Sequence, residues 1–152
     1  MRGFTLIELL VVIGVISILA AIAVPLYSKY VAKAHRAAIV SDVRSARIVV
    51  ESFILKYGEV PEDTSCPSEG FGPASCDLKA GTLIEVGALS VSTNSRVDVR
   101  RQDCGTKNGY YIHGTGANFP SWGYCFNSCD GKYSETDGSG CLHNHSLAKQ
   151  ML

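Results

Sequence analysis

The residue with the most distinctive chemistry is Glu8, a carboxylate that directly precedes a long apolar run. In residues 9–26 every side chain is apolar or small, and Ser17 is the only polar one. Placing a carboxylate in hydrocarbon is costly, so an acid in such a segment is a functional candidate and needs a cationic partner. A free amino group on another copy of the same helix would serve, because two opposite charges buried together offset much of each other's desolvation cost. Glu8 is therefore predicted to pair with an amine of a neighbouring copy.

Residues 9–26 are long enough to cross a membrane as a helix. At about 1.5 Å per residue they span roughly 27 Å, close to a bilayer core of about 30 Å. A second interpretation is an ordinary secretory signal, with Arg2 as its basic part, residues 9–18 as its apolar part and a cleavage site at Ala21-Ile22-Ala23. Glu8 argues against a secretory signal, since a carboxylate has no use in an apolar segment that is removed.

The residues around Glu8 also carry a family resemblance. Gly3-Phe4-Thr5-Leu6-Ile7-Glu8, followed by the apolar run, resembles the class III signal of type IV pilins and type II secretion pseudopilins. The resemblance implies that a prepilin peptidase cuts between Gly3 and Phe4, removes a leader of residues 1–3 and methylates the new amine of Phe4. It also implies that Glu8 neutralises the Phe4 amine of the adjacent subunit during filament assembly.

Gly14 and Pro25 extend the resemblance and would both weaken a long helix. Proline removes a backbone donor and clashes with the preceding turn, so the sequence predicts a kink near Pro25. By resemblance to the family, the stretch between the two residues can unwind locally in the filament. Gly14 can equally be a position at which two helices pack closely.

After Pro25 the helical pattern continues as an amphipathic half. Apolar residues recur at spacings of three and four in one stripe, formed by Ile39, Val43, Ala46, Val50, Phe53 and Tyr57. Gly58 then suits a helix C-cap and Pro61 follows, which resembles the Gly-x-x-Pro step that ends the long helix in many pilins. One helix is expected over residues 4–57, with a transmembrane or filament-core half at 4–28 and an amphipathic half at 29–57.

Residues 58–152 are expected to form a globular head. A loop is predicted at 62–79, a strand or helical turn at 83–91, a turn at 107–109 and another loop at 114–121. Strands are predicted at 96–100, from 110 to 113 and at 122–126, and residues 127–152 read as a polar segment with a helical end at 146–152. The expected fold is α+β and type IV pilin-like, a long helix packed on an antiparallel sheet of three or four strands.

The chain has six cysteines, all after the apolar run: Cys66, Cys76, Cys104, Cys125, Cys129 and Cys141. An even count in this position is typical of a domain exported into an oxidising compartment, and six cysteines allow 15 pairings that the sequence does not distinguish. A bridge between Cys66 and Cys76 would tie the loop at 62–79. Cys125 and Cys129 with His143 and His145 could instead be read as a zinc set, but disulfides are the stronger interpretation.

Other candidate sites are weaker. Asp130, Glu135 and Asp137 lie in a Gly- and Ser-rich stretch whose oxygens could hold calcium, although the EF-hand spacing is absent. His113 has no visible catalytic partner, and the chain contains no G-x-S-x-G, H-E-x-x-H or P-loop motif. No enzymatic activity and no cofactor are expected.

Charge is balanced overall but unevenly distributed. A basic collar of Lys29, Lys33, Arg36, Arg44 and Arg47 faces one acid, Asp42, and could touch lipid headgroups or acidic neighbours. From residue 58 onward seven basic and eleven acidic residues give a formal charge of −4, which disfavours DNA as a partner. A local patch of Arg96, Arg100, Arg101 and Lys107 keeps DNA contact open.

Three functions are compatible with these patterns. The favoured one is a pilin, held in the inner membrane as a precursor and then assembled by pilus machinery with copies of itself into a surface filament for adhesion, motility or DNA uptake. The second is a pseudopilin of type II secretion, and the third is a secreted disulfide-rich binding domain released after Ala23. The six cysteines favour the pilin, since each disulfide stabilises a long-exposed filament subunit by typically about 2–4 kcal/mol.

Overall fold

The computed structural model describes residues 4–105, 107–137 and 141 of the 152-residue chain. The chain forms two compact units, Met1–Ala34 and His35–Leu152, and the second is called the head unit below. One helix, α1 (Leu6–Tyr57), contributes to both units. The strands, all in the head unit, are β1 (Thr64–Cys66), β2 (Ala74–Ala80), β3 (Leu83–Val91), β4 (Ser95–Asp103), β5 (Asn108–Gly116), β6 (Phe119–Asn127) and β7 (Lys132–Thr136).

The amphipathic stripe predicted for the helix is the face that α1 buries in the head unit. Ile39, Val43, Val50 and Phe53 are each no more than 1% exposed, and Ala46 is also buried. Tyr57, the last residue of the helix, is half-buried. These positions share one face because they recur every three or four residues on a helix of 3.6 residues per turn.

Helix α1 ends at the glycine that the sequence indicated. Gly58 has φ +77° and donates its backbone N–H to the carbonyl of Ile54 at 2.8 Å. A left-handed residue of this kind closes the last helical turn, and glycine adopts it without a steric cost.

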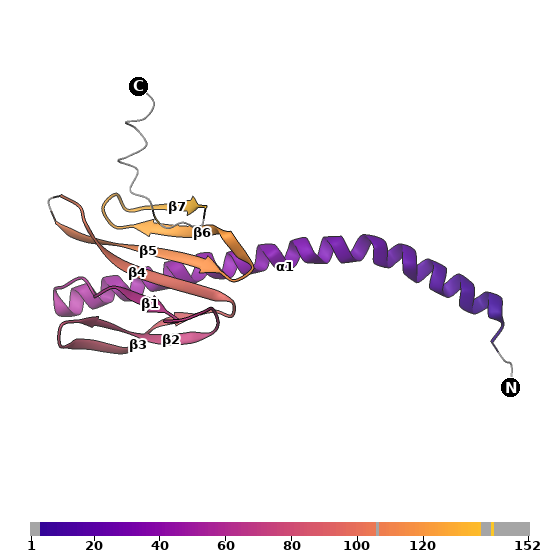
Figure 1. Ribbon diagram of the computed structural model, residues 1–152, viewed down its shortest axis with the longest axis horizontal. Helices are drawn as coiled ribbons and strands as arrows, with labels where there is room; N and C mark the ends of the chain where they lie inside the picture. The colour runs from indigo at the N-terminus through magenta and orange to yellow at the C-terminus, as the bar shows by residue number, and fades with distance from the viewer. Residues whose placement is uncertain (1–3, 106, 138–140, 142–152) are drawn as a thin grey trace, which may run out of the picture. The chain divides into compact units, whose positions relative to one another are not determined.

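The sheet is antiparallel throughout, as predicted, but larger than three or four strands. Five strands lie in the order β1-β4-β5-β6-β7, and β2 and β3 form a separate two-stranded hairpin (Figure 1). Val97 and Val99 of β4 point into the core while the side chains of Arg96, Asp98 and Arg100 lie on the outer face. This alternation is the one that the sequence showed for residues 96–100.

The loop predicted at 62–79 is wrong, because it contains β1 and all but the last residue of β2. Ala74, Cys76, Leu78 and Ala80 alternate with polar or small residues and turn inward. The serines, glycines and prolines that precede them obscured this short alternation. The ambiguous segment at 83–91 is strand β3, which pairs with β2 from Leu83↔Ala80 to Val91↔Ala74.

The sheet also corrects the predictions for the loop at 114–121, the polar segment at 127–152 and the turn at 107–109. Residues predicted as a loop at 114–121 instead extend β5 to Gly116 and start β6 at Phe119, which leaves a two-residue turn. The polar segment after residue 127 contains β7, which pairs with β6 from Asn127↔Lys132 to Gly123↔Thr136. Asn108, expected in a turn, is the first residue of β5. The helix predicted at 146–152 lies outside the described residues.

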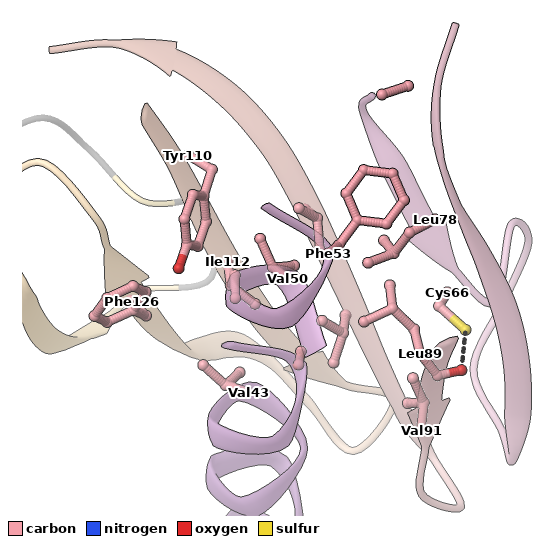
Figure 2. Close-up of a cluster of buried hydrophobic side chains, with 14 residues drawn as sticks. Val43, Val50, Phe53, Cys66, Leu78, Leu89, Val91, Tyr110, Ile112 and Phe126 are labelled. Carbon is pink, nitrogen blue, oxygen red and sulfur yellow. Dashed lines mark hydrogen bonds between the residues drawn. The ribbon is translucent and has the colours of Figure 1, made fainter. Parts of the chain in front are cut away.

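The core forms where α1 meets both sheets. In Figure 2 Val43, Val50 and Phe53 of α1 lie between Leu78, Leu89 and Val91 of the hairpin and Tyr110, Ile112 and Phe126 of the larger sheet. Helix and sheet approach each other closely at Gly114, where an added Cβ would clash with Val43 Cγ2 and lie 2.9 Å from Ile39 Cγ2. A side chain at this position would therefore push the helix off the sheet.

Polar contacts fix the remaining parts of the head unit. Asp42, only 7% exposed, accepts hydrogen bonds from the Ser92 backbone N–H at 3.0 Å and the Ser92 hydroxyl at 2.7 Å. Arg101 donates to the carbonyls of Pro61 at 3.0 Å and Val60 at 2.7 Å, which ties the segment after the helix to β4. Both contacts join segments that are far apart in sequence.

Candidate functional site at the helix N-terminus

Thr5, the residue before α1, and Glu8, in its first turn, form a reciprocal cap that holds the Glu8 carboxylate. Thr5 donates its backbone N–H to Glu8 Oε2 at 2.9 Å and its hydroxyl to the same oxygen at 2.8 Å. In return the Glu8 backbone N–H donates to Thr5 Oγ1 at 3.4 Å. This is the capping box, in which a Ser or Thr N-cap and a Glu three residues later satisfy two free backbone donors.

The capping box is a local role for Glu8 that the sequence reasoning missed. The signal was present, since Thr5-x-x-Glu8 before an apolar run is the pattern of a capping box. Only Oε2 of Glu8 takes part in these hydrogen bonds. No ion pair within the described part of the chain involves Glu8. Its pairing with a neighbouring amine stays a prediction.

The helix after Glu8 exposes an apolar surface that the single chain leaves uncovered. Its large aliphatic side chains from Leu6 to Leu26 are all at least 49% exposed, and Phe4 is 86% exposed. An 18-residue window of α1 near the N-terminus has a mean hydropathy of 2.9 and none of it is buried, so its length and composition suit a membrane span. The one hydroxyl in this run is satisfied internally, because Ser17 donates to the carbonyl of Ile13 at 2.7 Å. A large exposed apolar surface of this kind marks a site of contact with a membrane or with other protein.

The other residues of the predicted motif lie on the same helix. Pro25 lies inside α1, and a Cβ added at Gly14 would meet no atom within 4 Å. Gly14 therefore faces open space in the single chain, where another helix could approach. The kink near Pro25 and the local unwinding stay predictions. Gly3, the residue before the predicted cut, lies outside the described residues.

All six cysteines form disulfides, Cys66–Cys76, Cys104–Cys129 and Cys125–Cys141. The first is the bridge that the sequence suggested, and it joins β1 to β2. Cys125 and Cys129 belong to two different disulfides, so they supply no thiolates for the alternative zinc set. His143 and His145 of that set lie outside the described residues.

The acidic residues considered for calcium do not share a loop. Glu135 lies on β7 and accepts a hydrogen bond from the Trp122 indole N–H at 3.3 Å. Asp130 lies before β7 and accepts from the Lys132 backbone N–H at 3.1 Å. No group of three or more His, Cys, Asp or Glu side chains that could hold a metal occurs among the described residues.

The described contacts of His113 are not those of a catalytic residue. It is 7% exposed on β5, opposite Asp98 of β4, and its Nε2 lies 3.5 Å from Thr136 Oγ1. Burial lowers the pKa of His113, and the charge of Asp98 opposes that shift. The contacts within the described part of the head unit fit a buried, neutral imidazole in a sheet rather than a general base.

The local basic patch on β4 is largely occupied by contacts inside the head unit. Arg96 and Arg100 lie 3.3 Å and 3.6 Å from Asp98 Oδ1, and Arg100 also donates to the Ser65 hydroxyl at 2.9 Å. Arg101 is engaged with backbone carbonyls, as described above. Arg101 and Lys107 are exposed. Asp98 partly neutralises Arg96 and Arg100, while Arg101 and Lys107 keep their positive charge.

Three arginines of the basic collar lie over aromatic rings of β6 and β7. Arg36 lies over Phe119 and Trp122, Arg44 over Tyr133, and Arg47 over Phe126 and Tyr133, with distances of 4.3–5.8 Å between guanidinium carbon and ring centroid. Arg47 also pairs with Glu51 at 2.7 Å. Its hydrogen bonds to the Tyr133 hydroxyl and the Glu51 carboxylate raise the pKa of Arg47. Arg47 is therefore part of the packing of the helix on the sheet.

Known proteins share both the N-terminal motif and a larger part of the chain. The family described as "Prokaryotic N-terminal methylation motif" matches residues 1–24. A fimbrial protein of Pseudomonas aeruginosa is 37% identical over 112 residues, which cover 63% of this chain and 73% of the relative. The type IV major pilin protein PilE1 of Neisseria gonorrhoeae is 34% identical over 98 residues, with coverage of 62% and 53%. The type IV major fimbrial protein FimA of Dichelobacter nodosus is 41% identical over 61 residues, with coverage of 40% and 39%. No solved structure matches the chain significantly.

The chain combines a helix with an exposed apolar first half and a second half packed on a disulfide-tied antiparallel sheet, and its relatives place it in the class of non-enzymatic fimbrial subunits. The extent of the match to the Pseudomonas protein and the N-terminal motif are specific enough to go further: the chain belongs to the type IV pilin family. The family implies assembly into a filament, processing by a prepilin peptidase and a place in a pilus at the cell surface.

Proposed function

We propose that this pilin is a subunit of a surface pilus whose core is built from the first half of α1. The observation that supports the proposal is the continuous apolar surface from Leu6 to Leu26, which is exposed along its whole length in the single chain. Lipid covers this surface in the precursor, and copies of the same helix cover it in the filament. A head-to-tail contact whose rotation does not close repeats as an open helical array, which is the assembly that we propose.

The predicted processing site would place a charge beside Glu8. A cut between Gly3 and Phe4 makes the Phe4 amine the new N-terminus. Methylation converts this primary amine to a secondary amine, which can still carry a proton. The capping box holds Glu8 by Oε2 through Thr5, and its contacts leave Oε1 available. We assign this free side of the carboxylate to the Phe4 ammonium of the adjacent subunit, since an ion pair buried among apolar helices is favoured only when both partners are present.

Three variants separate this charge role from the capping role. Glu8→Gln keeps a capping box, since Gln also serves at this position, but removes the charge. Thr5→Ala keeps the charge and removes the cap. The proposal predicts that Glu8→Gln and Glu8→Ala leave few or no filaments in the sheared fraction, while Thr5→Ala still assembles. If Glu8→Gln assembles normally and Thr5→Ala fails, Glu8 acts through the cap alone and the ion-pair account is wrong.

Adhesion or twitching motility suits the surface of the head unit better than DNA uptake does. From residue 58 onward the chain carries a formal charge of −4, which disfavours a DNA backbone, and Arg96 and Arg100 share the Asp98 carboxylate. A pseudopilin of type II secretion is the alternative, and the location of the mature chain distinguishes it from a pilin. A pilin is abundant in filaments sheared from cells, whereas a pseudopilin stays with the cell envelope.

A further inference from the structure

Arg36 lies in an aromatic setting that its structural role does not explain. Its guanidinium carbon is 5.1 Å from the Phe119 ring centroid and 5.2 Å from that of Trp122. The two rings meet edge to face, 77° apart with centroids at 6.5 Å. No ion pair among the described residues involves Arg36, whereas Arg47, on the same helix, is paired with Glu51. Stacking on rings holds a guanidinium in place while its N–H donors stay free for an anion.

The residues that lead from the apolar run to Arg36 have the composition of a membrane interface. Arg36 follows Leu26 by ten residues in the sequence. Lys29 and Lys33 lie between them, and residues 9–41 contain no acidic residue. Tyr27 and Tyr30 are 72% and 65% exposed. Tyrosine, tryptophan and basic residues are enriched where a membrane helix leaves the hydrocarbon, and basic residues there are attracted to anionic lipids.

We propose that Arg36, Phe119 and Trp122 form a binding site for the phosphate group of an anionic phospholipid. The site docks the head unit on the bilayer surface while the apolar half of α1 is still in the membrane. Arg36 donates N–H groups to the phosphate, and the two rings fix the guanidinium. The occupant is a lipid rather than a soluble anion because Arg36 follows the apolar run by only ten residues of sequence and carries aromatic rings, which favour the interface.

Neighbouring contacts show what supports Arg36 and which arginine can serve as its control. The Trp122 indole donates to Glu135 at 3.3 Å, so this carboxylate orients the ring that supports Arg36. Arg44 is a matched cation farther along the helix, over one ring only, that of Tyr133 at 5.8 Å. It follows Arg36 by eight residues, about 12 Å of helix, which is more than a Debye length of about 8 Å at physiological salt. Arg44 should therefore contribute little to docking.

The chain supplies its own reporter, because Trp122 is its only tryptophan. The full chain is reconstituted in vesicles of phosphatidylcholine alone or mixed with phosphatidylglycerol, and bromine-labelled lipids report the depth of Trp122 by quenching. The proposal predicts a blue shift and stronger quenching with phosphatidylglycerol, both lost at 1 M salt. Arg36→Gln should lower the ratio of docked to undocked head units about five-fold, the share expected of one basic residue at an anionic surface, while Arg44→Gln leaves it unchanged.

Three results would overturn the proposal. They are equal Trp122 emission and quenching in both kinds of vesicle, equal effects of the Arg36 and Arg44 variants, and a change in phosphatidylcholine vesicles on addition of glycerol phosphate, which would assign the site to a soluble anion. Near-ultraviolet circular dichroism of each variant confirms that the head unit is folded. The inference concerns the membrane-bound precursor, so its failure leaves filament assembly by the mature chain untouched.

Discussion

The close approach of helix and sheet at Gly114 provides a quantitative test of how the head unit is packed. Gly114 of β5 faces Val43 and Ile39 of α1, and a methyl group added at Gly114 would overlap Val43 Cγ2 and lie 2.9 Å from Ile39 Cγ2. Both side chains are at most 1% exposed, so neither can rotate into solvent to make room. Gly114→Ala should therefore move the helix away from the sheet or force Val43 off its rotamer.

The size of the effect follows from the cost of overpacking. An extra methyl group in a well-packed core typically costs about 1–3 kcal/mol of the free energy of unfolding. Val43→Ala alone removes two buried carbons and should cost about 1–3 kcal/mol, by comparison with roughly 0.5–1.5 for each methylene lost from a core. In the double variant the added methyl group occupies the space that Val43 vacates. Its cost should fall short of the sum of the single costs by at least about 1 kcal/mol.

The assay is chemical denaturation of the full chain in detergent, followed by the emission of Trp122 with the disulfides intact. Sites that do not interact add within about 0.3–0.5 kcal/mol, so a larger coupling energy identifies the contact. Additive costs for the two variants, or a neutral Gly114→Ala, would refute the close approach of α1 to β5.

Further predictions concern other contacts of the head unit. Burial lowers the pKa of His113, so folding favours the neutral ring. The free energy of unfolding should then fall as pH drops below the unfolded value of about 6.5, and His113→Gln should flatten its pH dependence between pH 5 and 7, read from denaturation midpoints. Asp42→Ala should cost about 1–3 kcal/mol, measured the same way, because it leaves the Ser92 donors unpaired, while Asp42→Asn should cost less. Removing both Cys66 and Cys76 should cost about 3 kcal/mol from the chain entropy of a loop with a separation of 10 residues. An unchanged midpoint in the Asp42 or cysteine variants, or an unchanged pH dependence in His113→Gln, would contradict the contact concerned.

The long helix was predictable because each of its signals is local. The stripe from Ile39 to Phe53 repeats with the period of a helix, and Gly58 marks the end of α1 with its left-handed backbone. The strand at 96–100 was also predictable, since Val97 and Val99 alternate with charged residues. In each case the burial pattern is written in neighbouring residues and does not depend on a distant partner.

The rest of the head unit depends on partners that sequence periodicity does not reveal. Strand β7 is short, polar and at the edge of the sheet, and it forms because its backbone pairs with β6. The alternation of β2 becomes recognisable only with Cys66–Cys76 and the pairing to β3 in view. The six cysteines allowed 15 pairings, and the three that form are set by how the strands are arranged in space.

The sequence singled out Glu8 and Arg36 as candidate residues, but it did not reveal the contacts that each of them makes. Glu8 was identified by its charge in an apolar segment, and its role as a helix cap followed only from its contacts with Thr5. Likewise Arg36 was recognised as part of a basic collar, while the rings of Phe119 and Trp122 lie more than eighty residues away in the sequence.

The central claim is that the processed chain leaves the membrane and becomes part of a surface filament. Mass spectrometry of the mature N-terminus, on filaments sheared from cells and on the membrane fraction separately, tests it most directly. The account predicts abundant chains that begin with N-methylated Phe4 in the sheared fraction. Methylated Phe4 confined to the membrane fraction would contradict the surface filament and favour a pseudopilin, and a chain that begins at Val24 would contradict the role given to the apolar helix.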